Sequence, residues 1–152
     1  MIRSKYFSPS ELIEPSILEV LKDETAMCIV GQFICDCLYK LREDYEDAVK
    51  CADKYKSASD LWITINGNYH GSRFKYSGVR SKNCPIGAKY SKHKLGIAFD
   101  LKCTHLGILL YLIKNHWDSY YISRIENPEV TLHRGWIHVE FGFSNDLIIF
   151  NP

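Results

Sequence analysis

Apolar residues recur at helical spacing along the first part of the chain. Within 25–41 they stand three and four positions apart, which is typical of a helix that buries one face. The next stretch, 42–56, is dense in charged residues but keeps Tyr45, Val49 and Ala52 at helical spacing. The pattern therefore predicts a main core helix, followed by a partly exposed extension or a second helix.

A shorter helix is expected near the amino terminus. Ser8 and Glu11 have the spacing of a capping box, in which each side chain bonds to the backbone of the other residue. Pro9 suits the first turn of a helix, whereas Pro15 lacks the backbone donor that a helix interior needs. We therefore expect a helix that begins after Ser8 and is broken or restarted at Pro15.

The second half of the chain has the alternation and the short β-branched runs that are typical of strands. Asn127 and Pro128 form a turn signal between the last two runs. Thr104 can cap a helix that runs from about Leu106 to Asn115. The predicted strands are 61–65, 97–101, 120–125 and 136–141.

The order of these elements determines the predicted fold class. Helices come first and strands cluster later, so we expect an α+β domain with a mainly antiparallel sheet flanked by helices. The segment 66–91 is rich in glycine and aromatic residues, which predicts a long structured loop or an irregular hairpin. Long ordered loops often carry function. At 152 residues the chain is expected to form a single domain over 1–152.

The composition narrows the possible functions. The chain is 46% hydrophobic and 24% charged, an ordinary globular mixture that excludes disorder and a coiled coil. Its net charge of +1 provides no global field for a nucleic-acid backbone or an anionic membrane, so we expect neither partner. None of the 6 cysteines has the C-x-x-C spacing of a zinc knuckle, so we expect reduced thiols. The function should lie in a local site of a monomer.

Two further features bear on where the protein acts. The stretch 1–7 has no apolar segment behind its basic residues, so we expect no secretory signal and a protein that is cytoplasmic as synthesised. The apolar run Leu106–Ile113 is far shorter than the ~20 residues that cross a bilayer, so we expect no membrane span. Any action outside the cell would therefore follow release or lysis.

Two separated segments combine imidazole and carboxylate groups. His138 alternates with the apolar positions of its predicted strand, and Asp100 does so in the strand at 97–101. Two adjacent antiparallel strands could then direct both side chains into one site, and His93 shortly precedes Asp100. Two histidines and one aspartate leave a fourth position of a zinc ion open, which a hydrolytic zinc needs. These three residues could therefore form a three-ligand metal site, although each histidine taken alone is more typical of a hydrogen-bonded surface residue.

The sequence around these residues resembles a known family of enzymes. Residues 91–100 read S-x-H-x-x-G-x-A-x-D and residues 136–140 read W-x-H-V-E. Both patterns are similar, in the same order, to those of the zinc D-alanyl-D-alanine carboxypeptidases and the phage endolysin peptidases. The stretches 6–12 and 77–81 resemble the opening and the S-G-Y-R-S stretch of single-domain members.

The resemblance implies a fold, a cofactor and a substrate. It implies the hedgehog-type fold and a Zn²⁺ ion held by His93, Asp100 and His138. The chain would then be a zinc metallopeptidase that hydrolyses an amide next to a D-amino acid in peptidoglycan peptides, as a phage lysin or a wall-remodelling enzyme. Carboxypeptidase and endopeptidase action both stay open. The alternative is a module of the same fold that binds metal or peptidoglycan without turnover.

The group that would transfer protons has several candidates. His133 stands five residues before His138, as a catalytic histidine does in the carboxypeptidase branch. Other branches place a carboxylate three residues before the ligand, where this chain has Gly135. Glu126 and Glu140 are the carboxylate alternatives, and Glu140 could also support the metal ligands from behind.

An arginine completes the site that the resemblance implies. Arg80 is the preferred match, and it would hold a substrate carboxylate or stabilise the tetrahedral oxyanion. Val79 replaces the aromatic residue that usually precedes this arginine, and the gap from Arg80 to Asn83 is short. Arg73 therefore remains a rival for the same role.

Overall fold

The computed structural model describes residues 7–69 and 72–152. The segment 1–6, which includes the start of the stretch examined for a signal, and positions 70 and 71 of the predicted loop lie outside the described residues. The helices are α1 (Pro9–Leu12), α2 (Pro15–Val20), α3 (Asp23–Val30), α4 (Gln32–Cys51), α5 (Leu106–His116) and α6 (Pro128–Arg134), with the 3-10 helices η1 (Ala58–Leu61) and η2 (Lys92–Leu95). The strands are β1 (Gly67–Tyr69), β2 (Ser72–Phe74), β3 (Ala98–Leu101), β4 (Ile122–Glu126), β5 (Ile137–Phe141) and β6 (Ile148–Phe150).

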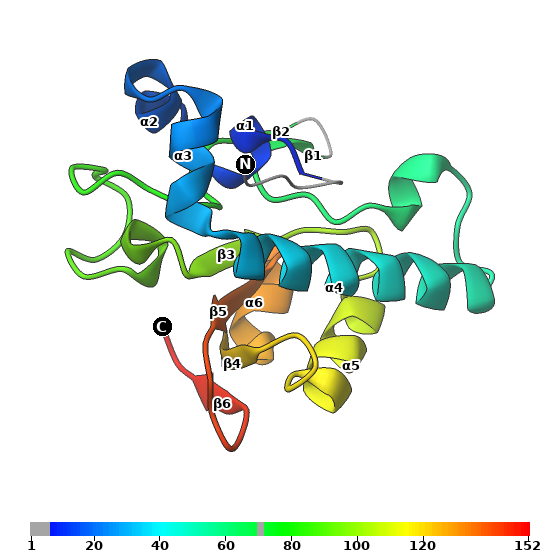
Figure 1. Cartoon of the computed structure of the whole chain (residues 1–152). Helices are drawn as coiled ribbons and strands as arrows, with labels where there is room; N and C mark the ends of the chain where they lie inside the picture. The colour runs from blue at the N-terminus through cyan, green and yellow to red at the C-terminus, as the bar shows by residue number, and fades with distance from the viewer. Residues whose placement is uncertain (1–6, 70–71) are drawn as a thin grey trace.

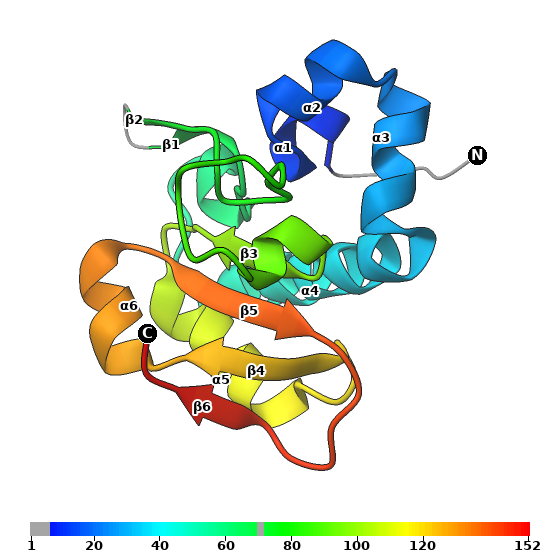
Figure 2. The same ribbon diagram turned by 90° about the vertical axis from the view of Figure 1, so that its left-hand side faces the viewer.

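The chain has an α+β fold built on a four-stranded mixed sheet. The strand order is β3-β5-β4-β6, in which β5 is antiparallel to both β3 and β4. The unpredicted strand β6 runs parallel to β4 and makes the sheet mixed. Helices α4 and α5 lie together on one side of this sheet. In Figure 2 they lie behind the sheet, whose other face is turned to the viewer.

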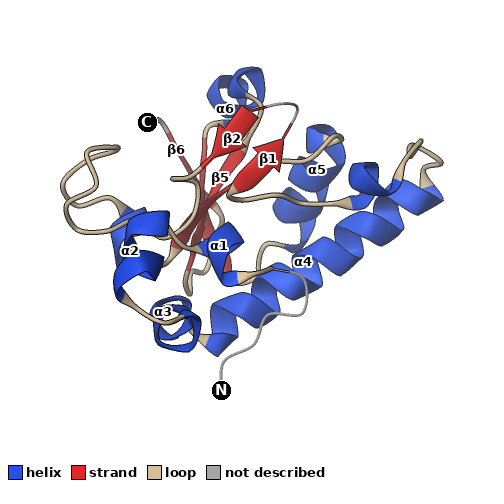
Figure 3. Cartoon of the chain, turned by 90° about the horizontal axis from the view of Figure 1, so that it is seen from above, coloured by secondary structure: helices blue, strands red, loops and turns tan. Residues whose placement is uncertain are grey.

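The helices and the sheet enclose one apolar core. Tyr45 and Val49 on α4 are fully buried, which confirms that the charged stretch after residue 41 continues the helix. Leu109 and Ile113 on α5 are equally buried, and Val139 faces them from the sheet. Figure 3 shows α4 and α5 on the same side of the strands. The opposite face of the sheet is therefore available for polar side chains.

The predicted core helix is divided in two at Gly31. This glycine has a φ of 79°, a conformation that ends α3 and that residues with a Cβ rarely adopt. Because the chain turns there, Ile29 and Phe33 are 39% and 45% exposed rather than part of the buried stripe. The prediction of one continuous helix was wrong, and α1, α2 and α3 instead gather above α4 (Figure 1).

The predicted strand at 61–65 does not form. Thr64 makes an isolated bridge with Lys102, while the backbone N–H of Asn66 bonds to the carbonyl of Glu11. Thr64 thus pairs with the residue that follows β3, and Asn66 already bonds to α1, so no ladder extends along the segment. The hairpin of β1 and β2 follows, in agreement with the irregular hairpin expected within 66–91.

The predicted turn at Asn127 and Pro128 is the start of α6. The side chain of Asn127 accepts a hydrogen bond from the backbone N–H of Glu129 at 3.0 Å, and Pro128 occupies the first helical position. Gly135, with a φ of 84°, ends the helix. The same residues that punctuate turns also begin helices, so the sequence signal was read as the wrong element.

Within the described residues, no helix combines the length and the apolar character that a membrane crossing requires.

Candidate metal centre

Asp100 and His138 are direct partners on the polar face of the sheet. They pair across β3 and β5, whose antiparallel register is continuous from Ala98 to Leu101. In β5 the side chains of Ile137 and Val139 are fully buried, which turns His138 to the other face. Alternation in two short strands therefore brings a carboxylate and an imidazole together, as the sequence predicted.

His93 reaches the same place from η2. Gly96, in the left-handed conformation with a φ of 73°, ends η2 and leads the chain toward β3. The His93 ring is 3% exposed, and its Nδ1 lies 2.9 Å from the carbonyl oxygen of Gly78. A carbonyl can only accept, so Nδ1 donates and Nε2 is the nitrogen that faces Asp100 and His138.

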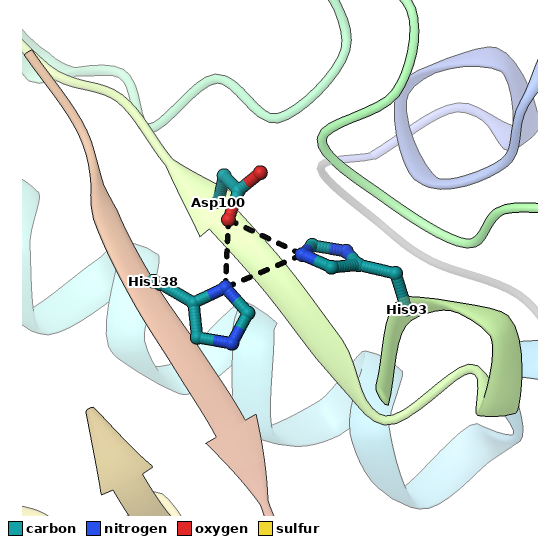
Figure 4. A group of neighbouring side chains, drawn as sticks. All are labelled: His93, Asp100 and His138. Carbon is teal, nitrogen blue, oxygen red and sulfur yellow. Dashed lines mark hydrogen bonds and ion pairs between the residues drawn. The ribbon is translucent and has the colours of Figure 1, made fainter. Parts of the chain in front are cut away.

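The three side chains present their donor atoms at one point, as Figure 4 shows. His138 Nδ1 lies 2.8 Å from Asp100 Oδ1, and His93 Nε2 lies 3.3 Å from each of these atoms. All three atoms are within 4.8 Å of one another. Two imidazole nitrogens and one carboxylate oxygen form a donor set that suits zinc, and the His93–Gly78 hydrogen bond is the outer support that such ligands commonly have. This group could hold a metal ion.

The second oxygen of Asp100 is held by Arg80. Arg80 Nη2 lies 3.2 Å from Asp100 Oδ2, and Arg80 Nε donates to the carbonyl of Tyr76. The arginine is 9% exposed, and Gly87 lies against it so closely that a Cβ there would approach Nη1 to 2.8 Å. Arg80 is therefore engaged in fixing the Asp100 carboxylate, a task different from the substrate contact that the resemblance implies.

The charges of the group are strongly coupled. Burial favours a higher pKa for Asp100, but hydrogen bonds to His138 and His93 outweigh it and hold that pKa well below its usual value. Burial alone would lower the pKa of His138, but the carboxylates of Asp100 and Glu140 raise it to about 9. Without a metal ion, Asp100 is thus an anion and His138 a cation.

The group opens into a polar cleft of about 520 Å³. Glu126 and Glu140 line this cleft, together with Arg124 and Arg134. A second recess of about 280 Å³ lies beside it and is lined by apolar side chains and by Arg73. Arg80, Asp100 and Trp136 line both spaces, so there is room on two sides of the group.

The two carboxylate candidates have different neighbours. Glu140 Oε1 lies 3.7 Å from His138 Nε2, and Arg124 Nη1 lies 3.1 Å from Glu140 Oε2. Glu126 is 7% exposed and has only a loose contact, of 3.5 Å, with Arg134 Nη1. Both carboxylates thus line the cleft, Glu140 beside the outer nitrogen of His138 and Glu126 beside Arg134.

The remaining candidates lie farther from the three donor atoms. His133 is exposed on α6 and is not among the residues that line the cleft. Arg73 is exposed on β2 at the second recess. The roles that the resemblance implies for them stay predictions.

Sequence reasoning missed Arg124. It pairs in register with Glu140 across β4 and β5, and it stands two positions before Glu126 on the same strand. Residues two apart on a strand share a face, so the alternation along β4 could have indicated it. Phe150 was also missed: its ring centroid lies 5.8 Å from that of His138, and the short strand β6 gave no clear signal.

Comparisons of the chain with protein-family models, with curated proteins and with solved structures found no match in any of the three. The case for a function therefore rests on the residues of the site.

Proposed function

We propose that this protein is a zinc-dependent peptidase that hydrolyses an amide bond in peptidoglycan peptides. The observation that carries the proposal is the meeting of His93, Asp100 and His138 donor atoms within 4.8 Å of one another beside an open cleft. Three protein ligands with an accessible remaining position are typical of catalytic zinc, whereas structural zinc sites are closed by four ligands.

The metal group and its neighbours have distinct tasks in this proposal. A zinc ion bound by the three side chains would polarise the scissile carbonyl and make a water molecule acidic enough to react near neutral pH. Arg80 fixes Asp100 through the oxygen that faces away from the histidines. Glu140 Oε1 lies 3.7 Å from the outer nitrogen of His138, where its charge favours this orientation of the ring.

Glu126 is the carboxylate that best fits the proton transfers. The pairing of Ile125 with Val139 brings the next residues, Glu126 and His138, alongside each other on β4 and β5. Glu126 also lines the cleft, where it can take a proton from water and return it to the leaving amine. This assignment replaces His133 as the preferred acid and base of the proposal.

The substrate class comes from the resemblance of residues 91–100 and 136–140 to peptidoglycan peptidases. The hedgehog-type fold belongs to the same proposal. The second recess supports a peptide that extends on both sides of the metal group, because Arg80, Asp100 and Trp136 border both spaces.

Hydrolysis of purified muropeptides tests the proposal. The purified protein should contain about one zinc ion per chain and release new amino groups from muropeptides. A chelator should stop the release, and added zinc should restore it. Stoichiometric zinc without amine release over hours would instead favour a binding module without turnover, and absence of zinc would refute the metal site itself.

A further inference from the structure

The segment Ser77–Gly78 lies directly behind the metal group and bonds to two of its members. The backbone N–H of Asp100 donates to the carbonyl of Ser77 at 2.7 Å, and His93 Nδ1 donates to the carbonyl of Gly78 at 2.9 Å. A Cβ on Gly78 would stand 2.1 Å from the carbonyl oxygen of Leu12, so this segment is pressed against α1. Any displacement of these two carbonyls would therefore move the backbone of Asp100 and the ring of His93.

Asn66 holds the backbone donors of this segment. It is 2% exposed, and its Oδ1 accepts from the N–H groups of Ser77 at 2.8 Å and of Gly78 at 3.3 Å. Its Nδ2 donates to the carbonyl of Ile13 at 3.3 Å. One buried amide thus ties both residues behind the metal group to the chain next to α1.

Lys102 holds the same segment from the other side. It is 1% exposed, and Nζ donates to the carbonyls of Ile65 at 2.9 Å and Asp100 at 3.1 Å and to Ser77 Oγ. Nζ also lies 4.4 Å from the centroid of the Phe74 ring. A lysine is almost never this deeply buried unless its ammonium group is paired or well bonded. Here two carbonyl oxygens and one hydroxyl oxygen accept from its three N–H donors.

We propose that Asn66 and Lys102 are positioning residues of the metal centre, which act by fixing the carbonyls of Ser77 and Gly78 against Asp100 and His93. This inference rests on the metal site of the proposed function but not on peptide hydrolysis. Neither residue touches the three donor atoms. Their effect should therefore appear in the affinity and geometry of the bound metal.

Metal binding by Lys102→Met tests the proposal. Methionine keeps the unbranched apolar stem but removes all three donors. Zinc affinity, measured by competition with a chromophoric chelator well below the unfolding temperature, should fall about 10- to 100-fold, as is common when outer partners of ligands are removed. The visible absorption bands of bound Co²⁺ should also shift, because they report the arrangement of the ligands. Ser77→Ala removes one acceptor of Nζ, leaves the backbone carbonyl, and should change both readouts in the same direction by less.

Val49→Ala is the matched control, since it opens a cavity in α4 away from the metal group. It should lower the unfolding temperature and leave zinc affinity and the Co²⁺ spectrum unchanged. Wild-type zinc affinity and a wild-type Co²⁺ spectrum in both Lys102→Met and Asn66→Ala would overturn the proposal. If those two variants do not fold, wild-type values of both readouts in Ser77→Ala would overturn it instead. Metal binding without amine release would refute the hydrolase and leave this inference standing; a wild-type chain that binds no metal would refute both.

Discussion

The metal group and the rim formed by α6 lie beside the same cleft but are held in very different ways. Asp100 has hydrogen bonds or ion pairs to His93, His138 and Arg80, and its backbone is bonded to Ser77. The α6 rim is a helix of 7 residues, and its basic side chains are exposed. Several contacts of buried groups fix the Asp100 carboxylate, whereas α6 buries Pro128 and Thr131 but leaves His133 and Arg134 at the surface.

This difference indicates that metal binding, which depends on fixed geometry, belongs to the metal group and not to the α6 rim. Metal ligands must keep their donor atoms within a few tenths of an ångström, which requires side chains locked by their neighbours. Exposed side chains on a short helix, such as that of His133, lose rotamer freedom when they are held in place, and this loss opposes a fixed geometry. We therefore expect changes in the first region to have large effects and changes at the rim to have small ones.

The largest effect is expected for His138→Ala. The substitution removes one ligand and leaves Asp100 without its 2.8 Å partner, so stoichiometric zinc should be lost. Elemental analysis of the purified variant measures this directly. His116→Ala, at an exposed position on α5, should retain the metal content of the wild type. Full zinc occupancy in His138→Ala would refute the assignment of the ligands.

Glu126→Gln should come next. It removes the group that accepts a proton but keeps the shape of the side chain, so kcat for amine release from muropeptides should fall about 10²- to 10⁴-fold. Zinc content should not change, because Glu126 is not a ligand in this arrangement. A fall in zinc content together with activity would show instead that Glu126 supports the metal.

Arg80→Ala separates two roles of the arginine. If Arg80 fixes Asp100, zinc affinity should weaken about 10- to 100-fold, and Arg80→Lys should recover only part of it because lysine lacks the planar fork of nitrogens that bonds both Tyr76 and Asp100. If Arg80 instead binds substrate, KM should rise while zinc affinity stays at the wild-type value. Chelator competition and steady-state kinetics on the same variants distinguish these outcomes.

The sequence was informative wherever one local pattern determined a position. Alternation in β3 and β5 was sufficient to place Asp100 and His138 on the polar face, because a period of two leaves no other choice once Val139 is buried. The capping box at Ser8 and the restart at Pro15 also formed as predicted, and the α+β class is confirmed.

Positions that depend on distant partners could not be read in this way. The segment 61–65 looked like a strand, but Thr64 bridges only to Lys102, just after β3, and the following Asn66 bonds to α1, which is far from β3 in the sequence. Lys102 follows the predicted strand at 97–101 and is buried, where its ammonium group donates to the Ile65 carbonyl and the Ser77 hydroxyl of two other segments. Local periodicity contains no information about these contacts.

The pH dependence of metal binding should be moderate and have a definite sign. His138 has a pKa of about 9 in the metal-free protein, so zinc must displace a proton below that pH. Zinc affinity should rise about tenfold per pH unit from 7 toward 9 and then level off. For the metal-free fold, the stabilisation from this raised pKa is complete below the unfolded value of about 6.5 and is lost as pH rises through about 9.

Glu140→Gln is the matched variant for this pH series. It removes one of the two carboxylates that raise the pKa of His138, so the affinity should level off at a lower pH. Calorimetric titration in two buffers with different ionisation enthalpies measures the proton release at each pH. An affinity that does not depend on pH between 7 and 9 would contradict a protonated His138.

The smallest effect is expected for His133→Ala on the α6 rim. His133 is exposed and does not line the cleft, and surface substitutions of this kind change stability by roughly 0.5 kcal/mol or less. Its kcat and zinc content should therefore match those of the wild type within about twofold, whereas in Glu126→Gln the kcat falls and only the zinc content is kept. A fall of about 10²-fold in kcat for His133→Ala, with full activity in Glu126→Gln, would move the acid and base to α6 and would show that this helix moves toward the cleft when substrate binds.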